Sequence, residues 1–260
     1  MSARAFVVAA SLLAASARAG ELDYNVGGGL RSFPWGAAIA GKIGWNEALW
    51  GVPPAMDPNA ALPSPWYGYL RPTLRLQTSG VVTAAEAAGE VFPVAILGFS
   101  IGHSSTHRNT TLATLDCGAL ACDGWLSRTR LSAHGTGGYG AAFVLSDVSV
   151  EWLRPSVKDR DFGDEASALA GQMGGDTLVR GEIKIGQRFG DRWSAGLSLV
   201  ASAMQKQKSD NAEAGVFVNY APAPWSFGVL AGTYRSSTAR PGFTVGAGVS
   251  WTPRRSYGLR

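Results

Sequence analysis

Side-chain character alternates with a period of two along almost the whole chain after residue 20. In the segment 178–188, Ile183 and Ile185 point to one side, and they alternate with Arg180, Glu182 and Lys184 on the other. A strand that is apolar on one face and polar on the other has this period, whereas an amphipathic helix repeats every 3.6 residues. No sustained helical stripe occurs in the sequence, so the pattern predicts an all-β protein.

The same alternation, bounded by turn residues, predicts ten strands. They cover 36–50, 66–84, 90–104, 124–135, 138–152, 177–189, 193–205, 211–221, 225–235 and 241–252. A further strand at 22–32 would make eleven, and a twelfth would then be needed to restore an even number. We therefore expect ten to twelve strands.

The connections between these segments alternate in length. Short turns are predicted at 85–89, 136–137, 190–192 and 222–224, and long loops at 51–65, 105–123 and 153–176, with intermediate ones at 206–210 and 236–240. All the longer connections would then lie at one end of the sheet. Alternating segments of about ten residues with short turns at one end and long loops at the other are typical of a transmembrane β-barrel.

Tryptophans support a membrane location. Six of them fall near predicted strand ends, where the amphipathic indole suits the membrane interface: Trp66, Trp125, Trp152, Trp193, Trp225 and Trp251. The alternative is a secreted β-sandwich, whose strands also alternate. Apolar, Gly-rich outer faces and one-sided loop lengths favour the barrel, which closes so that every backbone polar group is paired within the bilayer.

Composition excludes several other classes. Of the 260 residues, 46% are hydrophobic, only 16% are charged and 34 are Gly, which argues against a disordered chain or a coiled coil. The only apolar run near membrane length lies at the extreme N-terminus and is short for a membrane-spanning helix.

The N-terminus has the pattern of a secretory signal peptide, residues 1–19. Arg4 precedes an apolar stretch from Ala5 to Ala15, and Ala17-Arg18-Ala19 supplies small residues for cleavage after Ala19. An uncleaved anchor is the alternative. Cleavage would remove Arg4 and Arg18 and lower the formal net charge from +4 by two units. So small a positive charge does not support nucleic-acid binding. Residues 20–260 form a single predicted domain.

Cys117 and Cys122 are the only two cysteines, and export would place them outside the reducing cytoplasm. An oxidising compartment permits a disulfide that closes one loop, and free thiols are the alternative. A zinc site would require more ligands with paired spacing. The acidic residues of 153–176 lack the spacing of a calcium loop, and their alternation with basic residues suggests a solvated surface loop, so no metal is predicted.

In these features the chain resembles bacterial outer-membrane β-barrel proteins in general. The resemblance implies an outer-membrane location, contact with lipid, no prosthetic group, and a monomer or dimer. Such barrels usually end on an aromatic residue, and here Trp251 is followed by residues 252–260, which departs from the pattern.

Charged residues on the polar faces are predicted to line the lumen. They are Arg71, Arg75, Arg128, Arg130, Arg180, Lys184 and Arg188, against Asp147, Glu151, Glu182 and Glu213. The basic excess predicts a narrow pore for small, anionic solutes, because low-dielectric walls strengthen such a field. The alternative is a barrel plugged by paired side chains, with recognition by its surface loops.

A lipid-active hydrolase is the third hypothesis, because some outer-membrane barrels are lipases, deacylases or proteases. His103 and Ser104 lie at a predicted strand end, with Asp116 or Asp123 as the group that would orient the histidine. Neighbours on a strand point to opposite faces, so His103 and Ser104 would meet only at a bend.

His134 is interpreted as a lumen residue. Gly135–Gly140 matches a dinucleotide-binding pattern, but a strand follows it, so it is interpreted as a hairpin turn.

Overall fold

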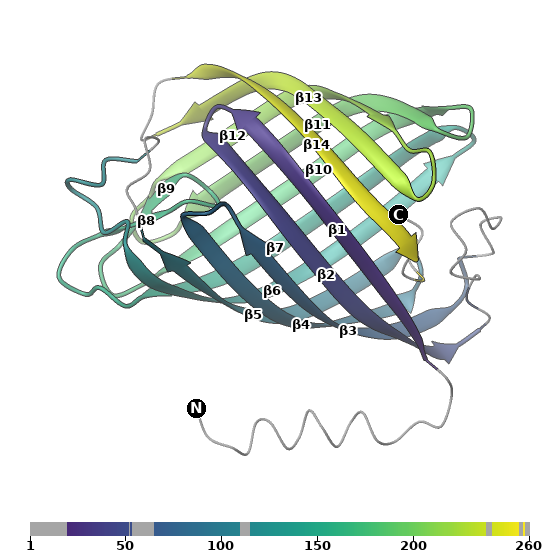
Figure 1. The fold of residues 1–260 in the computed structure, drawn as a ribbon, viewed down its shortest axis with the longest axis horizontal. Coiled ribbons are helices and arrows are strands. Elements are labelled where there is room, and N and C mark those ends of the chain that lie inside the picture. The colour runs from purple at the N-terminus through teal and green to yellow at the C-terminus, as the bar shows by residue number, and fades with distance from the viewer. Residues whose placement is uncertain are drawn as a thin grey trace.

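The computed structural model describes residues 20–51, 53, 65–109, 115–237, 241–254 and 257, and the predicted signal peptide lies outside these residues. Twelve strands form a closed antiparallel barrel in the order β1-β14-β13-β12-β11-β10-β7-β6-β5-β4-β3-β2, and a two-stranded sheet, β8-β9, is separate (Figure 1). Among the described residues there is no helix long and apolar enough to cross a membrane.

The barrel strands are β1 (Glu21–Ser32), β2 (Trp35–Trp50), β3 (Gly68–Thr78), β4 (Val82–Val94), β5 (Leu97–Arg108), β6 (Gly124–Tyr139), β7 (Ala142–Pro155), β10 (Asp176–Phe189), β11 (Trp193–Met204), β12 (Asp210–Tyr220), β13 (Trp225–Ser236) and β14 (Gly242–Arg254). The small sheet comprises β8 (Phe162–Asp164) and β9 (Leu169–Gly171). The first and last strands pair along Gly27–Arg31 and Gly246–Ser250, which closes the barrel and leaves no open edge.

The prediction of an all-β barrel with ten to twelve strands is confirmed, including the strand at 22–32. The twelfth strand comes from the region 66–104, which forms three strands where the pattern predicted two. The short turn predicted at 85–89 is wrong, because these residues lie inside β4. The chain instead turns at Ser79-Gly80-Val81, where Gly80 has a φ of +84° and the Ser79 N–H donates to the Val82 carbonyl.

The extra strand changes which loops share an end. We call the end at which β1 begins and β14 finishes the terminal end, and the opposite end the loop end. The strand ends that flank 109–123, 156–175, 205–209 and 237–241 lie at the loop end, but those that flank 51–67 lie at the terminal end. The prediction that all longer connections share one end is therefore wrong for 51–65. The turn predicted at 136–137 also moves, to Gly140-Ala141.

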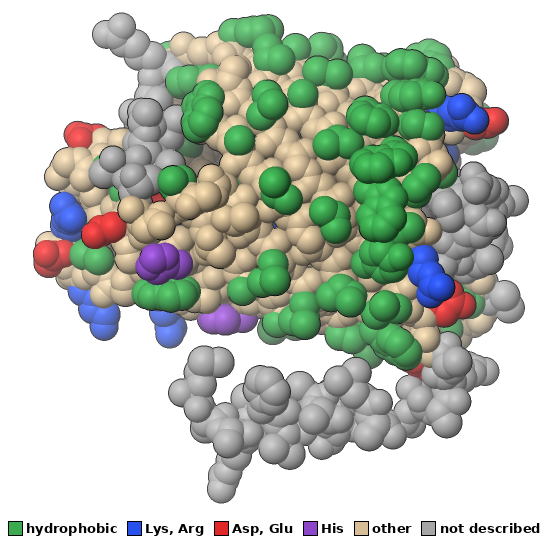
Figure 2. Space-filling model, in the orientation of Figure 1, with side chains coloured by type: hydrophobic (Ala, Val, Ile, Leu, Met, Phe, Trp, Pro, Cys, Tyr) green, Lys and Arg blue, Asp and Glu red, His purple; other side chains and the backbone are tan. Residues whose placement is uncertain are grey.

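The outer surface is apolar over the height of the barrel. Hydrophobic side chains are spread over the face seen in Figure 2, and they gather in a column near the terminal end. Leu76, Ile101 and Leu197 are each more than half exposed. Soluble monomers rarely expose a contiguous apolar surface of this extent, which marks contact with lipid. The secreted β-sandwich is therefore excluded.

Tryptophans lie on this surface near both ends of the strands, as the interface argument predicts. Trp193, Trp225 and Trp251 stand near the terminal end, and Trp125 and Trp152 near the loop end.

Candidate functional site in the barrel lumen

The two sides of the lumen differ in side-chain size. Strands β13, β14, β1 and β2 turn mostly small residues inward, and by register these are Ser226, Gly228, Gly232, Gly246, Gly248, Ser250, Gly27, Gly29, Gly36, Ala38 and Ala40. Strands β3, β4, β6, β7 and β10 turn charged side chains inward. Because the small residues leave space, a cavity of about 1110 Å³ remains inside the barrel. We call the small-residue side the glycine wall.

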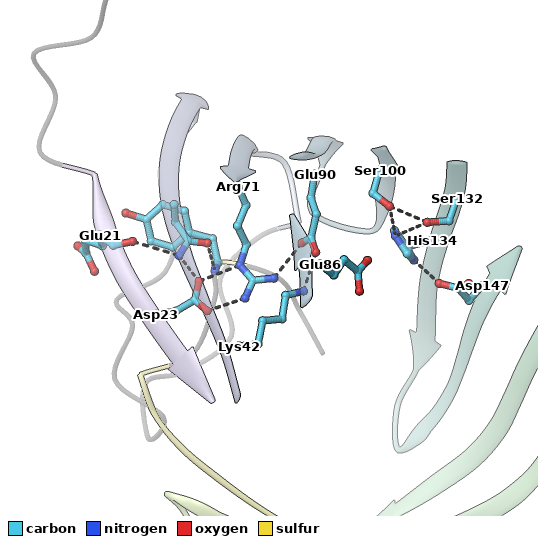
Figure 3. Close-up of polar contacts among 12 residues, drawn as sticks. Glu21, Asp23, Lys42, Arg71, Glu86, Glu90, Ser100, Ser132, His134 and Asp147 are labelled. Carbon is cyan, nitrogen blue, oxygen red and sulfur yellow. Dashed lines mark hydrogen bonds and ion pairs between the residues drawn. The ribbon is translucent and has the colours of Figure 1, made fainter. Parts of the chain in front are cut away.

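Near the terminal end, the charged side is organised around Arg71. Its guanidinium donates to both carboxylate oxygens of Asp23, at 2.8 and 2.5 Å, and to Glu90 Oε2 at 2.8 Å. The Lys42 ammonium donates to the other Glu90 oxygen at 2.6 Å, and Asn46 donates to Asp23 (Figure 3). Four strands, β1 to β4, are joined by this network.

Four other predicted lumen cations also meet carboxylates. Arg128 pairs with Glu151 and with Asp164, the latter at 2.5 Å, while Arg130 pairs with Glu86 at 2.7 Å. A third group lies on β10, where the Lys184 ammonium is 2.7 Å and the Arg180 guanidinium 3.9 Å from Glu182.

Two predicted lumen arginines have a different environment. Arg75 is exposed to the lumen and donates to Gln77 Oε1 at 2.8 Å, and Arg188 lies over the Phe143 ring. Neither forms an ion pair with a carboxylate among the described residues.

Sequence reasoning missed many of the lumen charges. The inward set also includes Asp23, Arg31, Lys42, Glu86, Glu90 and Arg108. Arg31 pairs with Glu213 at 2.7 Å. The additions comprise three cations and three carboxylates, so the basic excess stays the same, but Asp23, Glu86 and Glu90 supply the partners of Arg71 and Arg130. The same alternation, applied to 22–32, to 36–50 and to a strand at 82–94, could have found all of them except Arg108, which lies beyond the predicted end of 90–104.

The lumen is roofed at the loop end by the β8–β9 hairpin, residues 162–171. Phe162 and Leu169 are fully buried in an apolar cluster with Ala121, Leu126, Leu153, Leu178 and Met204. Asp164 is also fully buried and accepts hydrogen bonds from Arg128 and from the Ser167 hydroxyl at 2.6 Å. The hairpin thus crosses the barrel mouth, and the interpretation of 153–176 as a solvated surface loop is wrong for this part of it.

Contacts with strands on both sides of the barrel hold the hairpin. Arg108 on β5 donates to the Gly163 carbonyl at 2.5 Å and to Glu165 at 3.1 Å. On the far side, Asn211 of β12 donates to the Ser167 carbonyl, and Ser209 donates to the Ala170 carbonyl at 2.6 Å.

Glu165 occupies an unusual position in this roof. Its burial, reinforced by the adjacent Asp164 carboxylate, raises the pKa of Glu165 to about 7, although Arg108 acts in the opposite direction. Desolvation of a carboxylate favours its neutral form, which explains the direction.

Aromatic residues pack at the terminal end. Tyr69 stacks on Phe92 with ring centroids 4.4 Å apart, and Tyr257 meets Tyr69 edge-on. The Tyr67 hydroxyl donates to the Tyr257 carbonyl. Tyr257 lies beyond Trp251, so part of the C-terminal extension folds back against the barrel. Phe92 and Ala95 of this cluster also border the cavity.

The residues considered for a lipid hydrolase do not come together. His103 lies in the middle of β5 on the outer face, with Nδ1 3.1 Å from the Thr129 hydroxyl, whereas Ser104 faces the lumen. Asp116 lies in the 109–123 connection, where it accepts a hydrogen bond from the Gly118 N–H at 3.1 Å. Cys117 and Cys122, in the same connection, form a disulfide with a Cα–Cα distance of 5.5 Å.

No protein-family model matches the chain, and no match is found among curated proteins. Solved structures do share its architecture. An outer-membrane channel from Pseudomonas putida F1 superposes with a TM-score of 0.54 at 10% identity, over 91% of this chain and 97% of that one. The fold is that of a bacterial outer-membrane β-barrel.

Two other structures align less well. The KdgM porin gives a TM-score of 0.45 at 9% identity, over 88% of this chain and 98% of that one. The β domain of the Bordetella autotransporter BrkA gives 0.45 at 15% identity, over 90% of this chain and 100% of that one. The closed barrel, its apolar outer surface and the Pseudomonas fold together place this protein in the outer membrane.

Proposed function

We propose that this barrel allows passive passage of small polar solutes along its glycine wall. The observation that supports the proposal is the cavity of about 1110 Å³, which small inward residues leave open while charged side chains fill the opposite side. A twelve-stranded barrel with large side chains all around would be filled by them. The hairpin 162–171 and the aromatic cluster of Tyr67, Tyr69, Phe92 and Tyr257 restrict the two ends, so conductance should be small.

We further propose a weak preference for anions. Arg75 on β3 and Arg188 on β10 lie on well-separated strands of the barrel, and neither has a carboxylate partner among the described residues. The paired charges elsewhere cancel one another over a short distance, so the net field in the lumen comes mainly from these two cations.

The experiment is a pair of matched glycine substitutions in the refolded protein. A Cβ at Gly246, on the glycine wall, has its nearest neighbour at 3.5 Å, and a Cβ at the outward-facing Gly181 has none within 4 Å. Both positions therefore accept a side chain, but only Gly246→Phe projects it into the lumen. Single-channel recording should show reduced current for Gly246→Phe and unchanged current for Gly181→Phe. Equal currents in the two variants would refute passage along this wall.

Selectivity is read from the reversal potential under a salt gradient. Arg75→Ala should shift it toward the cation side, whereas an unchanged potential would reject the anion preference and leave the pore proposal standing.

A plugged barrel that acts through its surface loops is the second candidate, and the docked hairpin favours it. The same recordings separate the two functions. Absence of current from protein whose heat-modifiable gel mobility confirms folding would favour the plugged barrel.

A further inference from the structure

The lumen contains a serine–histidine–aspartate arrangement that solute passage does not require. Ser100 on β5, Ser132 and His134 on β6 and Asp147 on β7 all face inward, on three consecutive strands. Ser100 and Ser132 are directly paired across strands, as are His134 and Asp147. The register of the barrel thus places an acid, an imidazole and two hydroxyls at one point (Figure 3).

The hydrogen bonds follow the order needed for an activated hydroxyl. Asp147 Oδ2 bonds to Nδ1 of His134, and because a carboxylate accepts there, the neutral imidazole carries its proton on Nδ1 and has Nε2 as its acceptor. Nε2 lies 3.3 Å from the Ser100 hydroxyl and 3.3 Å from the Ser132 hydroxyl, and the two hydroxyl oxygens are 2.6 Å apart. A base that is oriented by a carboxylate and reaches a hydroxyl is the arrangement by which serine hydrolases are recognised, whatever their fold.

The surroundings keep this group in place and connect it to the cavity. Phe92 stacks against the imidazole with the planes 17° apart. His134 and Asp147 border the cavity, whereas Ser100 and Ser132 are only 7% and 8% exposed. A reactive group must therefore be small to reach the hydroxyls. All four side chains point away from lipid, which excludes a membrane phospholipid as the substrate.

We propose that the group hydrolyses short-acyl esters of small polar alcohols inside the lumen. One serine oxygen forms a bond to the ester carbonyl carbon as its proton moves to His134 Nε2. The tetrahedral intermediate collapses, the carbon–oxygen bond to the alcohol breaks, and the alcohol leaves with that proton. Water then attacks the acyl-serine, again with His134 as base, and releases the carboxylic acid and the free serine.

Stabilisation of the oxyanion limits the rate. The backbone N–H groups of β5 and β6 are engaged in strand pairing, so we expect the second serine hydroxyl to donate to the oxyanion. Each lost oxyanion donor costs about 10²–10³ in kcat, so we expect turnover well below that of a serine protease. Asp147 is a positioning residue that acts through His134.

The first test is covalent labelling of the refolded wild-type protein. A fluorophosphonate reacts with an activated serine, and mass spectrometry locates the adduct. We expect one adduct, on Ser100 or Ser132. Folded protein that stays unlabelled, or is labelled elsewhere, overturns the proposal without the need for any variant.

The second test is hydrolysis of p-nitrophenyl acetate, with a control that the chain itself supplies. His103 on the outer face also lies near two hydroxyls, at 3.1 Å from Thr129 and 3.4 Å from Ser127, but it forms no ion pair with an acid among the described residues. We expect His134→Ala and the Ser100→Ala/Ser132→Ala double variant to lose at least about tenfold in kcat/KM, and His103→Ala to lose nothing.

The role of Asp147 needs a different readout. Asp147→Asn should lower kcat with little change in KM and should alter the pH–rate profile, because the histidine tautomer is no longer fixed. Equal effects of His134→Ala and His103→Ala would indicate non-specific hydrolysis and reject the assignment. These results are independent of ion conduction.

Discussion

The docked hairpin offers the sharpest test of how this barrel is closed, through the substitution Phe162→Ala. Phe162 is fully buried among Ala121, Leu126, Leu153, Leu169, Leu178 and Met204. Truncation of a buried Phe costs about 3–5 kcal/mol. Since about 1.4 kcal/mol corresponds to a factor of ten, the ratio of docked to undocked hairpin should fall by roughly two to four orders of magnitude.

Two measurements report this shift. Single-channel recording should show a larger or more frequently open current for Phe162→Ala than for the wild type. Limited proteolysis should cleave within 156–175 in the variant, because the undocked hairpin becomes accessible to the protease.

The matched control is Phe99→Ala on β5, where the ring faces outward and is 45% exposed. It removes the same atoms without touching the hairpin, so current and cleavage should stay at the wild-type level. If Phe162→Ala behaves like Phe99→Ala in both assays, the hairpin does not control access to the lumen.

Three further predictions concern the charges and the disulfide. The pKa of Glu165 is raised to about 7 in the docked hairpin, so docking is most stable below about pH 4.5 and weakens as the pH rises through 7. The current should therefore be larger at pH 8 than at pH 5, and Glu165→Gln should flatten this dependence. A larger current at pH 5 than at pH 8 would contradict the reasoning. Arg71→Ala leaves the carboxylates of Asp23 and Glu90 in the lumen without their main partner, which should lower the free energy of unfolding by about 3–5 kcal/mol. The urea midpoint of the refolded barrel should therefore fall. Arg188→Ala, at an exposed site, should leave that midpoint nearly unchanged. The Cys117→Ser/Cys122→Ser variant should destabilise the docked hairpin by about 2 kcal/mol in the chain-entropy model, because Ala121, inside the disulfide loop, forms a β-bridge with Phe162. If 156–175 is protected from protease as well as in the wild type, the disulfide loop does not support the hairpin.

Local pattern was sufficient for part of the fold and failed in a specific place. Strands such as β10, in which isoleucines alternate with charged residues, were predicted to within about two residues. Strand β4 begins Val-Thr-Ala-Ala-Glu-Ala-Ala, in which small residues on both faces weaken the alternation and hide the turn at Gly80. That one missed turn explains why the strand count was too low and why the loop 51–65 was predicted at the wrong end of the barrel.

Odd–even alternation along the sequence was enough to indicate a membrane barrel with charges inside, because the face to which a strand residue points depends only on whether its position is odd or even. Tertiary structure decided which charges meet: Arg71 and Asp23 are 48 residues apart and pair only through the register of β1, β2 and β3. The tertiary structure also determines that Phe162 packs in the apolar cluster at the barrel mouth and that Ser100 contacts His134. These contacts join residues that are distant along the chain, and their geometry exists only once the barrel has closed and each strand has a fixed offset from its neighbours.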